Sequence, residues 1–155
     1  SEEPMMRTRM FDKRMRKLET ADKEITVEER INFFGDLDAT ATIVSWGSPK
    51  GAVLEAMERL RPEGCKINFL QVRMPHPLTK EYIAKVLGKA KKRIIVEGNY
   101  GAQLAGVIRE QTGIAMDYFV LKWNGRPMSS DEVYEALKLI MLDKAPKRQV
   151  LTHGT

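Results

Sequence analysis

One stretch decides the fold class of this chain: Thr42-Ile43-Val44-Ser45-Trp46-Gly47-Ser48-Pro49-Lys50-Gly51-Ala52. Its β-branched, apolar first part predicts a buried strand that stops at Gly47, and a helix is expected to begin almost at once. Ser48 is predicted to cap that helix, because its hydroxyl can accept a free backbone N–H of the first turn. Pro49 then suits the first helical position, where a missing N–H costs nothing. The stretch therefore predicts a parallel strand followed by a crossover helix.

The same order of strand and helix recurs on the C-terminal side of this stretch. Apolar, β-rich runs predict strands near residues 42–47, 67–73, 93–97 and 116–122, with helices between and after them. Alternation at this short spacing is typical of βαβ units with a parallel sheet, right-handed crossovers and helices on both faces. The positions predicted to be buried are Ile43, Val44, Val53, Met57, Leu70, Val72, Ile95, Val96, Leu104 and Ile108.

The chain divides into three segments. Residues 1–30 are predicted to be an amphipathic linker helix, because apolar side chains recur at helical spacing among arginines and lysines: Met6, Met10, Phe11, Met15 and Leu18. The narrow apolar stripe of this helix needs a partner surface. Residues 31–143 are expected to be the α/β domain, which begins with a short strand over Ile31–Phe34. The hydrophobic periodicity stops beyond Asp143, so residues 144–155 are expected to be a tail of uncertain order.

Composition limits the classes of function. Hydrophobic content of 43% and charged content of 30% are typical of an ordinary globular protein. No apolar run approaches the ~20 residues of a membrane span, so no membrane partner is expected. The single Cys65 excludes a disulfide framework within the chain and fits a reducing, cytoplasmic location. The net charge of +5 is a mild bias, and the Met-rich stripe lacks the aromatic residues of a stacking platform, so no nucleic-acid partner is expected.

Familiar catalytic and cofactor motifs are missing from the sequence. It contains no G-x-G-x-x-G, no Walker A loop, no G-x-S-x-G elbow and no pair of His or Cys at metal-ligand spacing. His76 lies between two prolines and His153 lies in the tail, and neither has a neighbouring acid or nucleophile. Nothing next to Cys65 would lower the pKa of its thiol. The sequence therefore predicts no catalytic residue, no cofactor-binding residue and no metal ligand.

Two polar turns follow strands that this fold would place side by side. Ser45-Trp46-Gly47-Ser48 ends the first strand, and Glu97-Gly98-Asn99-Tyr100-Gly101-Ala102-Gln103 ends the third. Both turns open helices, whose N-terminal N–H groups favour anions. If the strands at 66–73 and 93–97 flank the strand at 42–47, the turns lie at the topological switch point, where open α/β sheets bind ligands. Two interpretations stay open: a site for a nucleotide or small anion, or a packed interface.

Several blocks occur in an order that is specific when taken together. They are residues 13–20, 42–48, 50–52, 68–73, 97–101, 103–106 and 125–127. These blocks resemble the alpha subunit of 2-oxoacid:ferredoxin oxidoreductases, in its C-terminal part, a domain similar to the transketolase C-terminal domain. The resemblance covers nearly the whole chain. It implies a three-layer α/β/α fold with a mostly parallel five-stranded sheet, in which Ile31–Phe34 is an antiparallel edge strand.

The resemblance also implies an activity for a larger assembly. That family carries out CoA-dependent oxidative decarboxylation of a 2-oxoacid on thiamine diphosphate, and electrons leave through iron–sulfur clusters to ferredoxin. The complete complex is thus expected to hold thiamine diphosphate, Mg²⁺ and iron–sulfur clusters. This chain has no GDG…N motif for magnesium diphosphate and no set of cluster-ligating cysteines. We expect it to be a non-catalytic piece whose partners are the N-terminal domain of the same subunit and the beta subunit.

Aromatic side chains on the two turns indicate contacts with another protein surface. Trp46 and Tyr100 are large and amphipathic, and they lie where a compact domain does not need them. The predicted interface residues are Trp46, Gly47, Ser48, Asn99, Tyr100 and Gln103 on the turns, with Met10 and Met15 on the linker helix. Asn99 and Gln103 are expected to supply hydrogen bonds. The alternative is a stand-alone α/β module that binds a nucleotide or small anion at the switch point.

Overall fold

A computed structural model describes residues 3–153 of the chain. Its strands are β1 (Ile31–Phe34), β2 (Ala41–Ser45), β3 (Ile67–Val72), β4 (Lys92–Glu97), β5 (Tyr118–Leu121) and β6 (Arg148–Val150). Its helices are α1 (Pro4–Glu24), α2 (Val27–Arg30), α3 (Lys50–Leu60), α4 (Lys80–Lys89), α5 (Gln103–Thr112) and α6 (Ser130–Met141), with a 3-10 turn, η1 (Arg61–Glu63), after α3.

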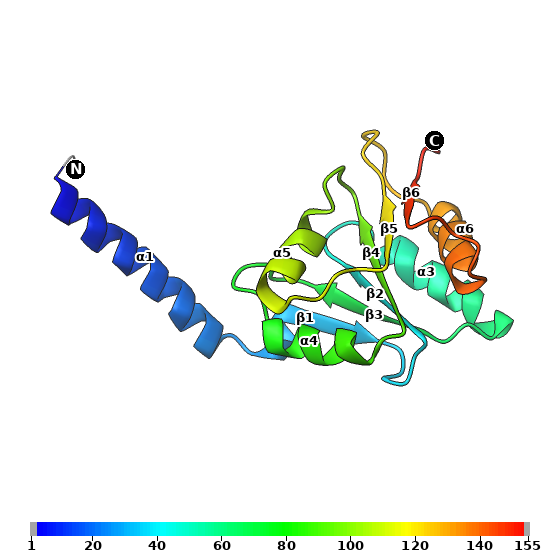
Figure 1. The fold of residues 1–155 in the computed structure, drawn as a ribbon, viewed down its shortest axis with the longest axis horizontal. Helices are drawn as coiled ribbons and strands as arrows, with labels where there is room; N and C mark the ends of the chain where they lie inside the picture. Colours follow the sequence, from blue (N-terminus) through cyan, green and yellow to red (C-terminus); the bar gives the residue numbers. More distant parts are fainter. Residues whose placement is uncertain (1–2, 154–155) are drawn as a thin grey trace.

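The strands form one sheet in the order β1-β3-β2-β4-β5-β6. All neighbouring pairs are parallel except β1 and β3, which pair antiparallel at one edge. Helices α3 and α6 cover one face of the sheet, and α4 and α5 cover the other (Figure 1). The predicted three-layer α/β/α architecture with its antiparallel edge strand is therefore confirmed.

The central strands are buried because helices cover both of their faces. Every residue of β2 and β3 is buried, as expected of parallel strands in the middle of a sheet. Neighbouring side chains enter different cores, so that Ile43 packs on the α3 and α6 side while Val44 packs on the α4 and α5 side. All the positions predicted to be buried are buried. Fully burying one such side chain contributes about 1.5–3 kcal/mol.

The C-terminal segment differs from the sequence prediction. A five-stranded sheet and a tail over residues 144–155 were expected, but β6 adds a sixth strand beside β5. The pairing is made by the main chain, because Phe119 N donates to Lys147 O at 2.8 Å. At the other end of the strand, Leu151 N donates to Leu121 O at 2.8 Å. Hydrophobic periodicity misses β6 because the strand is three residues long and mostly exposed.

Two helix boundaries also differ from the prediction. Pro49, not Ser48, is the residue at the N-cap position of α3, and it provides no side-chain cap. Ser48 is exposed and lies one residue too early to cap the helix. The described part of the predicted linker helix, residues 3–30, holds two helices instead of one, because Thr26 and Glu29 make a capping box that starts α2.

The helix α1 projects away from the sheet domain (Figure 1). None of its described residues is buried, and the exposed fractions of Met10 and Met15 are 44% and 50%. Its C-terminal end is tied to the domain by Arg30, whose Nη1 lies 2.6 Å from Asp22 Oδ1. The guanidinium of Arg30 is buried and also bonds Asp22 O at 3.2 Å. Within residues 3–153, no helix has both the length and the apolar character needed to cross a membrane.

Candidate interface at the carboxyl edge of the sheet

The carboxyl ends of β2 and β4 lie side by side, as predicted for the topological switch point. β2 pairs with β3 on one side and with β4 on the other, so Ser45 lies opposite both Gln71 and Val96. The chain leaves β2 toward α3 on one face and leaves β4 toward α5 on the other. The two turns that the sequence singled out therefore meet at one edge.

Glu97 is the buried centre of this edge. The last residue of β4, it is fully buried, and its carboxylate accepts hydrogen bonds from both turns. Trp46 Nε1 donates to Oε2 at 3.1 Å, and Asn99 Nδ2 donates to Oε2 at 2.7 Å. The main-chain N–H of Leu104 reaches Oε2 at 3.1 Å, and that of Ala105 reaches Oε1 at 3.1 Å. One carboxylate thus connects the end of β2, the turn after β4 and the start of α5.

The same carboxylate fills the place where a helix would receive an anion. The free N–H groups of the first turn of a helix attract negative charge. In α5 the N–H groups of Leu104 and Ala105 bind Glu97, and that of Gln103 donates to Asn99 Oδ1 at 3.3 Å. The first turn of α5 therefore has acceptors from its own chain. Sequence reasoning named Glu97 only as part of a turn and missed this role.

An exposed aromatic cluster lies beside this centre. The rings of Tyr100 and Trp123 meet edge to face, with their centroids 4.8 Å apart. The guanidinium carbon of Arg148 lies 5.1 Å from the Tyr100 centroid and 5.7 Å from that of Trp123. Arg148 Nη2 donates to Tyr100 O at 2.6 Å. We call these three side chains the aromatic–arginine cluster.

The cluster contains two residues that the sequence reasoning missed. Trp123 is the second residue after β5, and Trp46 is the first after β2, so the same rule of aromatic residues after strands could have found it. Arg148 lies in β6, which was expected to be a tail, and no pattern in the sequence places it beside Tyr100. The topology of the sheet makes the contact, because β6 pairs with β5, the strand that Trp123 follows.

The predicted interface residues differ in exposure and lie in two separate places. Trp46 and Tyr100 are exposed by 38% and 67%, and Gly47, Ser48 and Gln103 are exposed. Asn99 is half-buried, and its side-chain amide serves Glu97 and the first turn of α5. Met10 and Met15 are exposed on α1, which leaves the domain in another direction (Figure 1). The turn residues are brought together, and the two methionines lie apart from them.

A buried ion pair holds β6, and hence Arg148, in place. Lys122 Nζ lies 2.7 Å from Glu132 Oε2, and both side chains are almost fully buried. The same ammonium donates to Pro127 O at 2.9 Å and to the main-chain oxygen of His153. Burial raises the pKa of the Glu132 carboxyl, but the hydrogen bond and charge of Lys122 and the N–H of Ser129 lower it more, so this pKa lies below its ordinary value. The pair fastens the end of the chain to α6.

Comparison with known proteins gives the family of this chain. The family described as transketolase, C-terminal domain, matches residues 36–140. The chain belongs to this transketolase C-terminal domain family. Its homologues are alpha subunits of 2-oxoacid:ferredoxin oxidoreductases, as the sequence blocks predicted. The predicted resemblance is confirmed.

The relatives of this family member are much longer than the chain. It is 45% identical to the 2-oxoacid:ferredoxin oxidoreductase subunit alpha of Saccharolobus solfataricus, over 96% of this chain and 23% of that protein. It is 40% identical to the 2-oxoacid:ferredoxin oxidoreductase 2 subunit alpha of Aeropyrum pernix, over 100% of this chain and 24% of that protein. The chain thus spans about a quarter of the length of these relatives.

Solved structures match this transketolase C-terminal domain too. The 2-oxoglutarate:ferredoxin oxidoreductase from Magnetococcus marinus matches 89% of this chain with a TM-score of 0.71 and 26% identity, over 24% of that chain. The alpha chain of a probable 2-oxoacid ferredoxin oxidoreductase from Thermoplasma acidophilum matches 73% of this chain with a TM-score of 0.52 and 39% identity, over 97% of that chain.

The residues of this chain do not fit the cofactors that the family implies. Residues 3–153 contain no group of three His, Cys, Asp or Glu side chains that could hold a metal ion, and the sequence lacks the GDG…N motif for magnesium diphosphate. The sequence has one cysteine, whereas iron–sulfur clusters are held by several thiolates. Burial raises the pKa of the Cys65 thiol, as does the charge of Glu63, which disfavours the thiolate that a metal needs.

Proposed function

We propose that this chain is the C-terminal assembly domain of the alpha subunit of a thiamine-diphosphate-dependent 2-oxoacid:ferredoxin oxidoreductase, and that it is not catalytic by itself. The complete complex would carry out CoA-dependent oxidative decarboxylation of a 2-oxoacid in the cytoplasm, with thiamine diphosphate, Mg²⁺ and iron–sulfur clusters bound by its other parts. The homology to alpha subunits supports this proposal. So does the Magnetococcus enzyme, which has 2-oxoglutarate, coenzyme A and succinyl-CoA bound.

The position of Glu97 is the observation that carries the assembly role. In a module that binds phosphate at this edge, the first-turn N–H groups of α5 would be free for the ligand. Here the carboxylate of Glu97 takes them and also holds the indole of Trp46. The edge therefore presents aromatic surface to solvent. Exposed tryptophan and tyrosine are common anchors of protein interfaces.

We assign the contact with the N-terminal domain of the same subunit and with the beta subunit to two surfaces. The first is the carboxyl edge, with Trp46, Gly47, Ser48, Asn99, Tyr100 and Gln103. The second is the apolar stripe of α1, with Met10 and Met15. Within residues 3–153 the side chain of Gln103 makes no hydrogen bond, so it can bond a partner protein, whereas Asn99 acts through the turn that it fixes.

The test is made in the complete enzyme by replacing the two aromatic anchors. Trp46→Ala and Tyr100→Ala should each weaken assembly by more than about 1 kcal/mol, measured as the dissociation constant of the subunits. Trp46→Phe keeps a smaller aromatic ring and removes the hydrogen bond to Glu97, so it should assemble better than Trp46→Ala. Leu37→Ala is the matched control, because Leu37 is 60% exposed and lies in the turn after β1. If both alanine variants assemble like Leu37→Ala and only lose melting temperature, the anchors are core residues.

The alternative function is the binding of a nucleotide or small anion at the switch point. Calorimetric titration of the chain with thiamine diphosphate and Mg²⁺, and separately with ATP, should give no saturable heat. The reason is that the first turn of α5 already has acceptors and the sequence lacks the GDG…N motif for magnesium diphosphate. Micromolar binding of ATP would favour the alternative, and micromolar binding of thiamine diphosphate would overturn the non-catalytic assignment.

A further inference from the structure

Arg148 carries a positive charge that no described carboxylate neutralises. Six ion pairs within 4.0 Å involve other residues of 3–153, and none of them includes Arg148. Within the same part of the chain, the guanidinium makes one hydrogen bond, to Tyr100 O. It is held over the rings of Tyr100 and Trp123, so its remaining N–H groups are fixed in direction before any partner arrives.

The loops around Arg148 contain no acidic residue. The segments that follow β2, β4, β5 and β6 are residues 46–49, 98–102, 122–129 and 151–153, and they include Arg126 but no Asp or Glu. Helix α3 also starts at this edge without an acid in its first turn, which adds the positive end of its dipole, whereas the first turns of α5 and α6 already have the carboxylates of Glu97 and Glu132. Glu97 and Glu132 are buried, and Asp131 in the first turn of α6 is paired with Arg59 at 2.6 Å.

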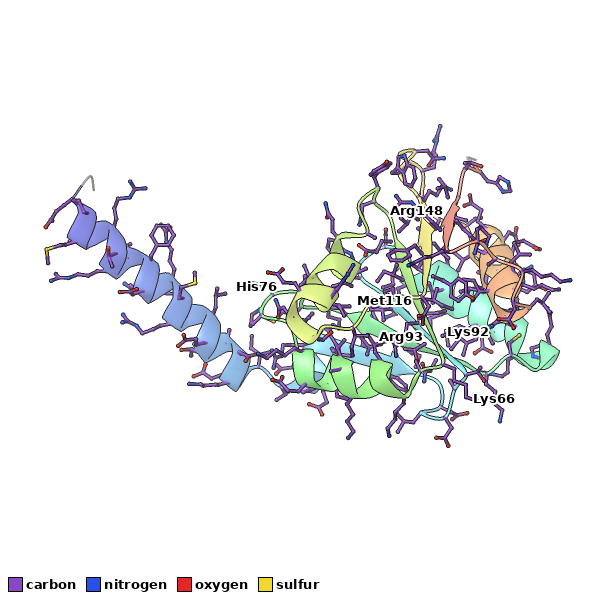
Figure 2. The ribbon with its side chains drawn as sticks, viewed as in Figure 1. Lys66, His76, Lys92, Arg93, Met116 and Arg148 are labelled. Carbon is purple, nitrogen blue, oxygen red and sulfur yellow. The ribbon has the colours of Figure 1, made fainter. Side chains whose placement is uncertain are left out.

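The opposite edge of the sheet has the acids that this edge lacks. Its loops carry Asp36, Asp38, Glu63, Asp117 and Asp143. Figure 2 shows Arg148 at the end of the domain where the loops after β4 and β5 lie, with Lys66 and Lys92 toward the other end. The part of the carboxyl edge next to β1 does carry acids, because β1 is antiparallel and Glu28 and Glu29 lie just before it. Exposed acids do occur on α6, where Asp131 and Glu135 line a hollow with Gln149 and Val150, so the acid-free part is limited to the loops that follow β4, β5 and β6.

We propose that the aromatic–arginine cluster receives an aspartate or glutamate side chain from a partner protein. The carboxylate would bond the free N–H groups of Arg148 as a charge-assisted pair, with Tyr100 and Trp123 packed against the apolar part of the same partner segment. This inference rests on the proposed function and adds to it the chemistry of the contacting surface, which is acidic within an apolar surround.

The composition of the cluster favours a protein over a nucleic acid. Tryptophan, tyrosine and arginine are the residue types that dominate binding energy at protein interfaces. A nucleic-acid groove needs several lysines and arginines that follow a phosphate backbone. Beside Arg148 only Arg126 is basic and exposed in the loops after β4, β5 and β6. One fixed guanidinium between two rings matches a single carboxylate.

The test uses charge variants of Arg148 in the complete alpha subunit with its companion subunits. Arg148→Glu should raise the dissociation constant of the complex by about 30-fold or more, and Arg148→Ala by about 10-fold. Arg148→Lys keeps the charge without the fork of N–H groups, so it should recover part of the loss. Lys66→Glu makes the same change in net charge at the opposite edge, where Lys66 is exposed, and should leave the dissociation constant within about 2-fold.

The salt dependence separates an ion pair from a structural role. From 50 to 300 mM NaCl the wild-type dissociation constant should rise several-fold, and the rise should be smaller in Arg148→Ala. If Trp46→Ala and Tyr100→Ala weaken assembly while every Arg148 variant behaves like Lys66→Glu, the acidic partner is wrong and the assembly role stands. If a labelled single-stranded RNA binds at micromolar concentration and Arg148→Glu abolishes that binding, the protein partner is wrong.

Discussion

The two ends of the chain meet the sheet domain in opposite ways. The C-terminal segment adds β6 to the sheet and is fastened by the buried Lys122–Glu132 pair. The N-terminal helix α1 is seven times as long as β6, at 21 residues against 3, yet it buries no described residue. It is tied to the domain through Asp22 and Arg30. Length and apolar content therefore do not decide which end of the described chain joins the sheet.

The difference comes from the needs of the main chain. A helix bonds its own N–H and C=O groups, so α1 can leave the domain without unsatisfied backbone. A strand has no internal partners, so β6 must pair with β5 to satisfy its N–H and C=O groups. Pairing with the sheet domain thus stabilises β6. Tertiary packing supplies most of the stability of a helix, so α1 would be stabilised by packing on a partner surface.

The largest expected effect comes from releasing the C-terminal end. Lys122→Met keeps the side-chain length but leaves the Glu132 carboxylate buried without its cation, which should cost about 3–5 kcal/mol in the free energy of unfolding. Urea denaturation measures this loss, and faster trypsin cleavage at Arg148 should accompany it. Lys66→Met is the control, because Lys66 is exposed and should change stability by less than about 0.5 kcal/mol. Equal stability of the two variants would contradict the fastening role of Lys122.

A smaller loss of stability is expected on acidification. Two capping boxes each contain a glutamate that can be protonated, Glu29 toward the N-terminal end and Glu132 toward the C-terminal end. Hydrogen bonds with Thr26 lower the pKa of Glu29, and the Lys122 and Ser129 contacts lower that of Glu132 against its burial. A carboxyl with a lowered folded-state pKa stabilises the fold above its unfolded pKa of 4.5, and this contribution is lost as the pH falls through the folded pKa.

The comparison of two variants separates the buried box from the exposed one. Thermal unfolding from pH 7 to pH 3 should show a flatter acid-side slope in Glu132→Gln, because Glu132 is buried and paired. Glu29→Gln should keep most of the wild-type slope, because Glu29 is exposed and water already solvates its charge. The reverse order would mean that the N-terminal box, not the C-terminal one, dominates the acid response.

The smallest effect on the chain itself is expected at the N-terminal end. Met10→Ser combined with Met15→Ser should change its melting temperature little, because both side chains are exposed on a helix that buries none of its described residues. Met57→Ser is the matched change in α3, where the methionine is buried and should cost about 2–5 kcal/mol. In the complete enzyme the double variant should weaken subunit association, measured by analytical ultracentrifugation. Unchanged association would remove α1 from the interface.

Most of the fold could be predicted from the sequence, because strong local signals agree with one another. Apolar runs such as Ile43-Val44 and Ile94-Ile95-Val96 alternate with helices of clear periodicity, and Ser129 with Glu132 marks the start of α6 as a capping box. β6 escaped prediction because Arg148-Gln149-Val150 has no apolar pattern. Its order depends on main-chain pairing with β5, a contact made across 25 or more residues of sequence.

The candidate site could be predicted in part. Trp46 and Tyr100 were placed at the carboxyl edge from their position after strands, and they lie there. The role of Glu97 could not be predicted, because its donors are distant in sequence or depend on the helix start. They are the indole N–H of Trp46, in the turn after β2, and main-chain N–H groups in the first turn of α5. Arg148 lay outside the predicted domain, so its contact with Tyr100 had no local signal.

The shared carboxylate of Glu97 has a consequence for hydrogen exchange. The amide protons of Leu104 and Ala105 exchange with solvent only when their bonds to Glu97 open. Trp46 Nε1 binds the same carboxylate, so a partner that packs on the indole also restrains Glu97. Contact at the end of β2 should then slow exchange at two amides in the first turn of α5, residues that no partner needs to touch. Through the buried glutamate, the exchange rates of these two amides report on assembly without any chemical modification of the protein.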